Sequence, residues 1–490
     1  MIMTERIKLT LLSLFNIVFL LTFTYVFMDT LVNPSRSFYE MNAIVIVILS
    51  MTLFAFLYGA YYLMNRLSAK KLIIWSGVNF TLLFILQIIF LVNFQVQPTW
   101  DIGSVYDAAL NQKDYFSYLS GYFTIKYPNN IPLFFLDLIG MRFLSLLGIE
   151  NYYFYFSIFN AFMVSVSMGC FYLFLKRRLG LVAATWGSLL MLFITPLYTY
   201  TTIVYTDTLV MIFPILSVLL YDIFYHSKRK SRYIILVLMS MTLTVGILIK
   251  TNAIILMVAI IIHFIITKRI KTYFTFLIGL LVPFLLINQL YQAVLSPYYP
   301  DGKENLGYPA TNWIMMGLHG NGNYHWEDAD FTYDLKVNQG LTNEEVKQVH
   351  LSVIKQRLSD YGVNGFIKHL QEKINFTWAD GTYYAPEKLS RSPIEVNQVQ
   401  SYIFGEERGD FVYSCQGVHL VVLLLILAGA VKLFKQKNAF ESVLSITIFG
   451  TFLFLLIWET RSRYLILYLP LMMLLSVYGM VAIKNLKIND

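Results

Sequence analysis

The sequence has 490 residues, of which 57% are hydrophobic, 17% aromatic and only 13% charged, and its mean hydropathy is +0.60. These values exclude an ordinary soluble domain and predict an all-α polytopic membrane protein. The net charge of +8 does not indicate nucleic-acid binding. The basic residues occur in short clusters between apolar runs, as the orientation signals of membrane proteins do.

Several apolar runs are long enough to cross a membrane as helices, because about 17 to 25 apolar residues span the hydrocarbon layer. They lie near residues 8–28, 41–64, 72–95, 153–175, 180–197, 206–226, 232–249, 252–267, 273–294, 417–434, 439–457 and 464–483. The sequence therefore predicts about 12 transmembrane helices. No small-residue cleavage site follows the first run, so we expect a retained anchor rather than a signal peptide.

Lysine and arginine cluster in alternate connections between these runs. With a cytoplasmic N-terminus the inner connections carry Arg6 and Lys8; Arg66, Lys70 and Lys71; Lys176, Arg177 and Arg178; Lys228, Arg229, Lys230 and Arg232; Lys268, Arg269 and Lys271; Lys432, Lys435 and Lys437; Lys484 and Lys487. Basic residues are retained on the cytoplasmic side of membranes. We therefore expect a multi-pass protein of the plasma membrane with both termini cytoplasmic.

One apolar run, IPLFFLDLIGMRFLSLL at 131–147, is interrupted by an aspartate and an arginine. If it were a span, the basic cluster at 176–178 would lie outside, against the charge rule. We therefore expect a helix over 131–148 that lies on the outer surface, with a full span and a reversed second half as the alternative. The chain then divides into two extra N-terminal membrane helices (1–64), a membrane core (65–294) with an outer catalytic loop at 96–130, an extracytoplasmic loop domain (295–416) and C-terminal membrane helices (417–490).

Ionisable residues gather at the predicted outer ends of the spans. Asp101, in PTWDIGSVYDAAL, stands a few residues beyond a long apolar run. A charge at a membrane boundary is costly, and such residues usually face a bundle interior or a water-filled cavity. The others on this side include Asp107, Lys126, Asp207, Lys250, Glu459, Arg461 and Arg463. Together they predict one extracytoplasmic active site, although each alone could be a snorkelling anchor or part of an ion pair.

The loop domain at 295–416 contains 16 acidic and 10 basic residues, which predicts a solvated, mainly helical segment. TNEE at 342–345 fits a capping box that opens a helix to about residue 358, and a second helix follows the break YGVNG. The segment FTWADGTYYAPEK combines turn residues with aromatics, among them Trp378 and Tyr383. Aromatic side chains beside carboxylates suit sugar binding, and they are equally ordinary in an interfacial belt.

The seven histidines do not have the spacing of a helical metal site. His319 and His325 lie on the predicted outer side and could join carboxylates at a cation, so a divalent cation is compatible with the site but not required. No Walker loop, dinucleotide fingerprint or nucleophile elbow occurs. An activated substrate is therefore expected to arrive through the membrane.

The order of these features resembles the GT-C superfamily of integral membrane glycosyltransferases, which use polyprenyl-phosphate sugars. The family includes bacterial relatives of protein O-mannosyltransferases and the aminoarabinose transferases. The matching elements are the acidic loop TWDIGSVYDAA, the motif IKYPNNIPLFFLDLIGMRFLSLLGI with its surface helix, the span closing with LKRRLG, GILIKTNA, and ETRSRYLILYLP. The chain departs from the family in having three spans before the loop instead of one, and in separating Asp101 from Asp107 by six positions.

The resemblance implies that Asp101 is the catalytic base of an inverting sugar transfer, with Asp107, Tyr127 and Asp207 in support or on the acceptor side. Cations near the lipid phosphate would be Lys250, Arg461, Arg463 and Lys126. Sugar contacts would come from Trp378, Tyr383 and Glu459. The implied partners are a polyprenyl-phosphate sugar donor, a glycan or protein acceptor and the lipid bilayer, with no nucleic acid and no required cofactor.

Abundant Ile, Lys, Asn and Tyr with few Pro and Ala are typical of proteins of low-GC bacteria. This composition favours a cell-envelope glycan acceptor, such as teichoic acid or wall polysaccharide, ahead of a protein acceptor. Two other classes remain open. A lipid-glycan flippase or transporter would have a similar number of spans but is expected to show internal repeats. A polysaccharide polymerase or ligase would rely on the outer loop and not on Asp101.

Overall fold

The computed structural model describes residues 5–114, 119–268, 272–298, 305–436 and 439–486. Over these residues the chain is helical and contains no strand, and only an isolated bridge joins Val96 to Pro393. The prediction of an all-α polytopic membrane protein is confirmed. Four of the basic residues assigned to the inner side, Arg269, Lys271, Lys437 and Lys487, lie outside the described residues.

In the described part of the chain, nine helical segments are long and apolar enough to cross a membrane. They comprise α1 (Glu5–Val32), α2 (Ala43–Met64), α3 (Ala69–Asn93), α6 (Tyr152–Leu179), α9 (Thr206–Leu209) with α10 (Ile212–His226), α11 (Arg232–Ile249), α13 (Tyr273–Leu295), α18 (Gly409–Lys435), and η9 (Ser462–Tyr468) with α20 (Leu469–Leu486). Shorter apolar helices complete the set: α7 (Leu181–Leu190), α12 (Ile254–Thr267) and α19 (Ser442–Ile457). The runs that the sequence predicts as spans all contain apolar helix.

The extra N-terminal helices are part of the bundle. α1 and α2 both pack against α18, and α1 also contacts α12, α16 and α19. The indole of Trp186 on α7 donates a hydrogen bond of 2.8 Å to the carbonyl of Leu57 on α2. Ser76 and Asn79 on α3 bond to Thr185 and Ser188 on α7. These buried polar contacts tie the first three helices to the rest of the bundle.

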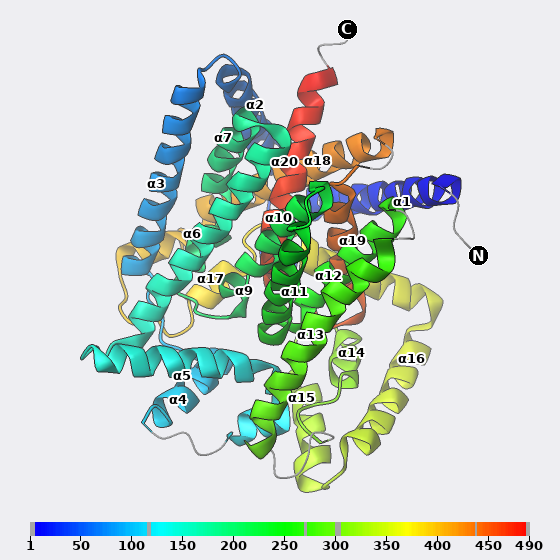
Figure 1. The fold of residues 1–490 in the computed structure, drawn as a ribbon. Coiled ribbons are helices and arrows are strands. Elements are labelled where there is room, and N and C mark those ends of the chain that lie inside the picture. The colour runs from blue at the N-terminus through cyan, green and yellow to red at the C-terminus, as the bar shows by residue number, and fades with distance from the viewer. Residues whose placement is uncertain (1–4, 115–118, 269–271, 299–304, 437–438, 487–490) are drawn as a thin grey trace.

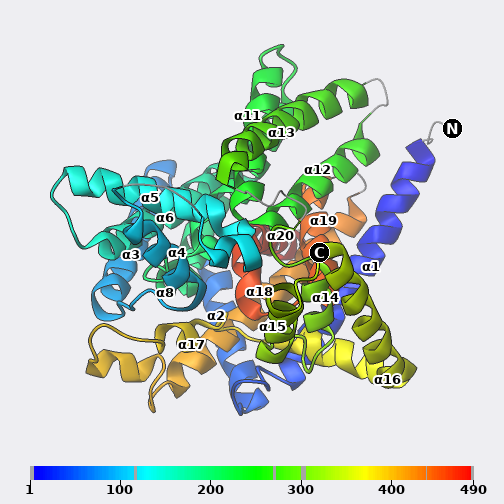
Figure 2. The same cartoon turned by 90° about the horizontal axis from the view of Figure 1, so that it is seen from below.

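The helix predicted at the surface is α5 (Ile131–Leu146). In Figure 1 it lies across the lower end of α6, beside α4 (Trp100–Asn111), and it contacts both helices. Helices α14 (Thr311–Gly317), α15 (Trp326–Tyr333) and α16 (Asn343–Trp378) lie at the same end of the molecule. Seen from that end in Figure 2, α4 and α5 lie on one side and α14–α16 on the other, with α18 and α20 between them.

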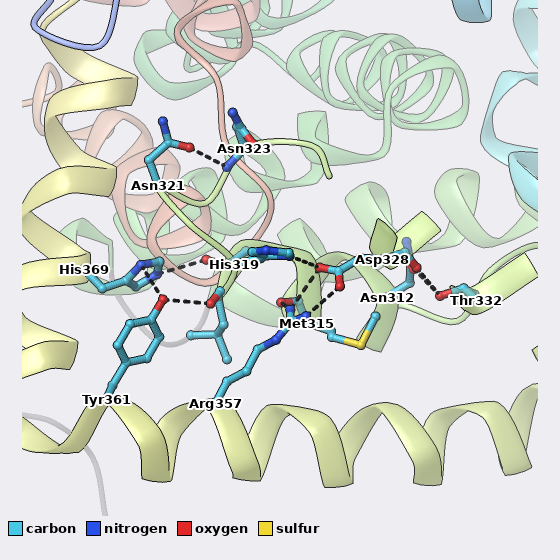
Figure 3. A network of polar contacts seen from close by, with 12 residues as sticks. Asn312, Met315, His319, Asn321, Asn323, Asp328, Thr332, Arg357, Tyr361 and His369 are labelled. Carbon is cyan, nitrogen blue, oxygen red and sulfur yellow. Dashed lines mark hydrogen bonds and ion pairs between the residues drawn. The ribbon is translucent and has the colours of Figure 1, made fainter. Parts of the chain in front are cut away.

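Helix α16 begins as the sequence predicts. Thr342 and Glu345 form a reciprocal capping box, and the helix is interrupted at Gly362, where φ is 55°. Its middle holds a polar network (Figure 3): the Arg357 guanidinium donates to both oxygens of Asp328, and the Tyr361 hydroxyl donates to the carbonyl of Leu318. The helix thereby fixes the loop that follows α14.

That loop reaches the C-terminal membrane helices. His369 and Lys373 on α16 donate to the carbonyl of Gly317 at 3.1 and 2.8 Å. The carbonyl of Gly322 in turn accepts a hydrogen bond of 2.8 Å from the backbone of Thr460. Helix α16 and the loop after α14 therefore hold in place the short segment between α19 and η9, which carries Glu459 and Arg461.

Candidate functional site

Asp101 occupies the first turn of α4, where the helix dipole favours a carboxylate. Its Oδ1 accepts a hydrogen bond of 2.9 Å from the Tyr122 hydroxyl. That hydroxyl accepts from Asn130 at 2.7 Å, and Asn130 accepts from Tyr205 at 3.3 Å. The chain of bonds fixes the carboxylate, while Oδ2 accepts nothing from the described residues. Asp101 is half-buried and has one oxygen available.

The residue before Asp101 has an unusual backbone. Trp100 adopts a φ of 49°, which is rare for a bulky side chain and is maintained only when the surroundings enforce it. The Lys388 ammonium lies 3.2 Å from the centroid of its ring, and the Arg391 guanidinium lies 4.7 Å from it. The Trp100 Nε1 is buried and has no acceptor among the described residues. Basic side chains from the region of α17 (Ala385–Leu389) therefore cover the turn that positions Asp101.

Asp207 is the centre of the buried charges. It is 1% exposed, and it accepts from the Lys250 ammonium and from Arg463 Nη1 at 3.3 Å. The three residues come from three interruptions of helices: the short α9, the junction after α11, and η9. An aspartate with two cationic partners is well supported in a buried site. It also leaves these cations less free than Arg461 to bind a ligand.

Arg461 and Arg463 still have donors to offer. The guanidinium of Arg461 lies 4.5 Å from the Tyr384 ring centroid, and Arg463 lies 5.6 Å from that of Tyr205. The Nε atoms of both arginines are buried, and none of the residues that the structure describes accepts a hydrogen bond from them. Buried guanidinium N–H groups without acceptors are costly and are seldom left so without a reason. Together with Trp100 and Lys388 they form one group of unpaired donors, which we call the donor cluster.

Glu459 links this cluster to Asp101. It is 5% exposed and accepts a hydrogen bond of 2.9 Å from the Tyr464 hydroxyl. Burial raises the pKa of Glu459, the charges of Arg461 and Arg463 oppose that rise, and the negative charge of Asp101 adds to it. The hydroxyl oxygens of Tyr127 and Tyr324 lie 3.4 Å apart, and burial raises the pKa of both tyrosines, with the charge of Asp101 adding to the rise. The carboxyl groups of Asp101 and Glu459 thus both lie near the arginines of the donor cluster.

The structure does not place every predicted site residue near Asp101 and the donor cluster. Asp107 is exposed on α4. Lys126 lies over the ring of Tyr333 at 4.7 Å, in the outer domain.

The two aromatics predicted as sugar contacts are in the core. Trp378 is 2% exposed and packs against Phe23 and Phe452. Tyr383 is 3% exposed and its hydroxyl lies 3.1 Å from Nδ1 of His419. Their burial leaves no face for a sugar, and we correct their assignment on that ground.

Sequence reasoning missed Lys388, Arg391 and Tyr384 among the cations and their aromatic partners, and Tyr122, Asn130 and Tyr205 among the groups that hold Asp101. The sequence contained an indication for most of these residues. Lys388 and Tyr384 belong to the aromatic segment FTWADGTYYAPEK, and Tyr122 and Asn130 belong to YFTIKYPNN. Arg391 follows three residues after Lys388.

Of the two histidines predicted on the outer side, His319 lies in the polar network of Figure 3 and His325 stacks on its ring, away from the donor cluster. Their rings stack at 3.8 Å, and His319 Nδ1 lies 3.2 Å from Asp328, which Arg357 already pairs. Within the described ranges no group of three His, Cys, Asp or Glu side chains could hold a metal ion. A cavity of about 380 Å³ opens elsewhere, at the ends of α6, α10 and α18, and is lined by Arg178, His226 and Lys432.

These features define an integral membrane protein with a buried, charged site where several helices are interrupted. The family model described as conserved hypothetical integral membrane protein matches residues 3–483, and the chain belongs to this family. Comparison with curated proteins finds no match.

Solved structures with a similar arrangement include the archaeal oligosaccharyltransferase AglB from Archaeoglobus fulgidus in complex with an inhibitory peptide and a dolichol-phosphate. The match has 12% identity and a TM-score of 0.45, and it covers 86% of this chain and 50% of that one. Another is the oligosaccharyltransferase of the same organism in complex with Zn and sulfate, with 12% identity, a TM-score of 0.48 and coverage of 85% and 49%. The chain spans about half the length of these structures.

Proposed function

We propose that the protein is a membrane glycosyltransferase that moves a sugar from a polyprenyl-phosphate donor to an extracytoplasmic acceptor. The observation that carries the proposal is the donor cluster beside a carboxylate. Among the described residues, the Nε atoms of Arg461 and Arg463 and the Nε1 of Trp100 have no acceptor, and Asp101 is fixed through Tyr122 while its second oxygen accepts no hydrogen bond. Displacement of a sugar from a lipid phosphate needs both halves, N–H donors for the leaving phosphate and a base for the acceptor.

In the proposed step an acceptor hydroxyl attacks the anomeric carbon while its proton passes to Asp101. The new bond joins the acceptor oxygen to that carbon, the bond from the carbon to the phosphate oxygen breaks, and the lipid phosphate leaves with the electron pair. A single displacement inverts the anomeric centre. Arg461 and Arg463 would stabilise the charge that develops on the phosphate. The loss of one such contact is expected to cost about 2 to 4 kcal/mol, or roughly 30- to 1000-fold in rate.

The cations of the site can neutralise the leaving phosphate, so the proposed step requires no metal ion, and a divalent cation remains compatible with it. Lys250 is expected to act through Asp207, to which it is paired. Burial raises the pKa of Tyr127 and Glu459, Asp101 lies close enough for its negative charge to add to the rise, and we propose that these two side chains contact the acceptor or sugar hydroxyls. The proposed acceptor is a cell-envelope glycan such as teichoic acid or wall polysaccharide, at the extracytoplasmic face of a bacterial plasma membrane.

The test measures transfer of label from a panel of polyprenyl-phosphate sugars to envelope fractions, with membranes that contain wild-type protein, Asp101→Asn or Asp410→Asn. Asp410 is the matched control because it is also an aspartate in the first turn of a helix, α18, but is exposed. We expect transfer with wild type and Asp410→Asn, and loss of transfer with Asp101→Asn. Full activity in folded Asp101→Asn protein would exclude the assigned base.

The same experiment separates the acceptors. Label that survives proteinase digestion indicates a glycan, whereas label lost with digestion indicates a protein O-glycosyltransferase. An absence of transfer from every donor, with the protein folded, would favour the polymerase or flippase classes.

A further inference from the structure

Lys388 differs from the other basic residues of the site because no hydrogen bond or ion pair from the described residues supports its charge. The side chain is 3% exposed, and its ammonium makes neither a hydrogen bond nor an ion pair with the described residues. Its neighbours are rings: the Trp100 centroid at 3.2 Å and the Tyr384 centroid at 5.9 Å. An aromatic face attracts a cation only weakly compared with the water that burial removes.

The charges that face Lys388 from the packed elements are mostly positive. Arg391 follows it in the chain, Arg461 and Arg463 approach from the segment around η9, and Asp207 on α9 is the carboxylate among them. Asp207 is already paired with Lys250 and Arg463. Burial lowers the pKa of the Lys388 ammonium to about 4, with the three arginines adding to the effect and Asp207 opposing it. The amine is therefore uncharged at neutral pH unless an anion lies beside it.

A bound anion would counteract both the burial and the repulsion from the arginines that lower the pKa of Lys388. A phosphate between Lys388 and the arginines supplies the missing negative charge, screens the guanidinium groups from the amine and accepts its hydrogen bonds. The unpaired Nε1 of Trp100 and Nε of Arg461 offer further donors in the same cluster. The flexible four-carbon stem lets the Lys388 head group move from the indole towards such a ligand.

We propose that Lys388 is a ligand of the donor phosphate and that the phosphate binds together with one proton, which Lys388 takes up. The inference rests on the phosphate site of the proposed function. It adds that Lys388 acts as a switchable cation, neutral when the site is empty and charged when the phosphate is present. Anion affinity then depends on pH through the protein and not through the ligand.

The probe is dihexyl phosphate, a phosphodiester that remains singly charged from pH 6 to 8 and resembles the lipid-linked phosphate. Binding to the full-length protein in detergent is measured by calorimetry in two buffers of different ionisation enthalpy, which reports the number of protons taken up. For wild type we expect an uptake near one, and a dissociation constant that rises about tenfold per pH unit. Inorganic phosphate in a parallel titration shows whether the site requires the alkyl groups.

Three variants isolate Lys388. Lys388→Met should bind at least tenfold more weakly at pH 6 and take up no proton. Lys388→Arg keeps a permanent charge and should bind without proton uptake and with little pH dependence. Lys336→Met is the matched control: Lys336 is another lysine whose pKa burial lowers, to about 8, but it bonds to loop carbonyls of the outer domain. Lys336→Met should take up the same number of protons on binding as wild type.

Several results would overturn the inference: no binding to folded wild type, binding without proton uptake, or an unchanged uptake in Lys388→Arg. The outcomes are separable from those of the transfer assay. Proton-linked binding without sugar transfer would leave the inference standing and remove the proposed function. Sugar transfer together with phosphate binding that takes up no proton would remove the inference and leave the proposed function standing.

Discussion

The Lys388 ammonium lies 3.2 Å from the centroid of the Trp100 ring, so a buried lysine covers the strained residue next to Asp101. Such a lysine destabilises the empty protein, because its charge is well solvated only after unfolding. We expect Lys388→Met, which keeps the length and the packing on the indole, to stabilise the empty protein by about 1 to 4 kcal/mol near neutral pH. Binding and stability would then oppose one another at this residue.

The pH dependence of this effect has a definite sign. The pKa of Lys388 is lowered from 10.5 to about 4 on folding, so the unfolded state binds more protons between these values and the stability of wild type rises with pH. The advantage of Lys388→Met should therefore be larger at pH 6 than at pH 8, by about 1.4 kcal/mol per pH unit. Thermal unfolding in detergent at the two pH values measures it. A variant that melts at or below the wild-type temperature at both would contradict the prediction.

Asp207 is the buried anion that holds Lys250 and Arg463. Asp207→Asn leaves two cations without a counter-charge and should cost about 3 to 5 kcal/mol. Lys250→Met leaves the pair of Asp207 with Arg463 and should be milder, and the double variant should fall between the single ones. The folded fraction after detergent extraction and the melting temperature report this order. Lys347→Met, which removes an exposed pair with Glu344, should change neither.

The spans and much of the charged cluster can be predicted from the sequence because both are marked by patterns along the chain. Hydropathy marks the helices, and ionisable residues at the ends of apolar runs mark one face, so Asp207, Lys250 and Arg463 could be grouped before any contact was known. Lys388 could not, since a lysine in a polar loop is expected to be solvated. Its burial depends on backbone bonds between distant segments, Gln97 to Ser392 and Ile394 to Gln95, both at 2.9 Å.

The aromatic segment shows a second limit of sequence reasoning. Tyr383 and Tyr384 both have positive φ, 54° and 66°. This turn sends Tyr383 into the core beside His419 and turns Tyr384 towards Arg461. Trp378 ends α16 and packs on Phe23 of α1. Adjacent aromatics look alike in sequence, and only the local backbone decides which one reaches the site.

The orientation of the chain gives a further prediction. If the basic connections are cytoplasmic, a cysteine in place of Lys228, which is exposed between α10 and α11, should not react with a membrane-impermeant maleimide added to intact cells. Val396→Cys should react, because Val396 is 87% exposed at the end of the molecule that carries Asp101. The native Cys170 and Cys415 are both buried and give a low background. Labelling of Lys228→Cys but not Val396→Cys would reverse the topology.

Tyr122 is expected to position Asp101 without touching the substrate. Tyr122→Phe removes the hydroxyl that donates to the carboxylate at 2.9 Å and accepts from Asn130. A hydrogen bond to a charged group contributes about 1.5 to 3 kcal/mol, so kcat should fall roughly 10- to 100-fold with the KM for the donor nearly unchanged. Tyr308→Phe is the control, since within the described part of the chain that hydroxyl bonds only to the carbonyl of Ala329 on α15. A rise in KM with an unchanged kcat would assign Tyr122 to donor binding instead, and would mean that Asp101 is held by other contacts.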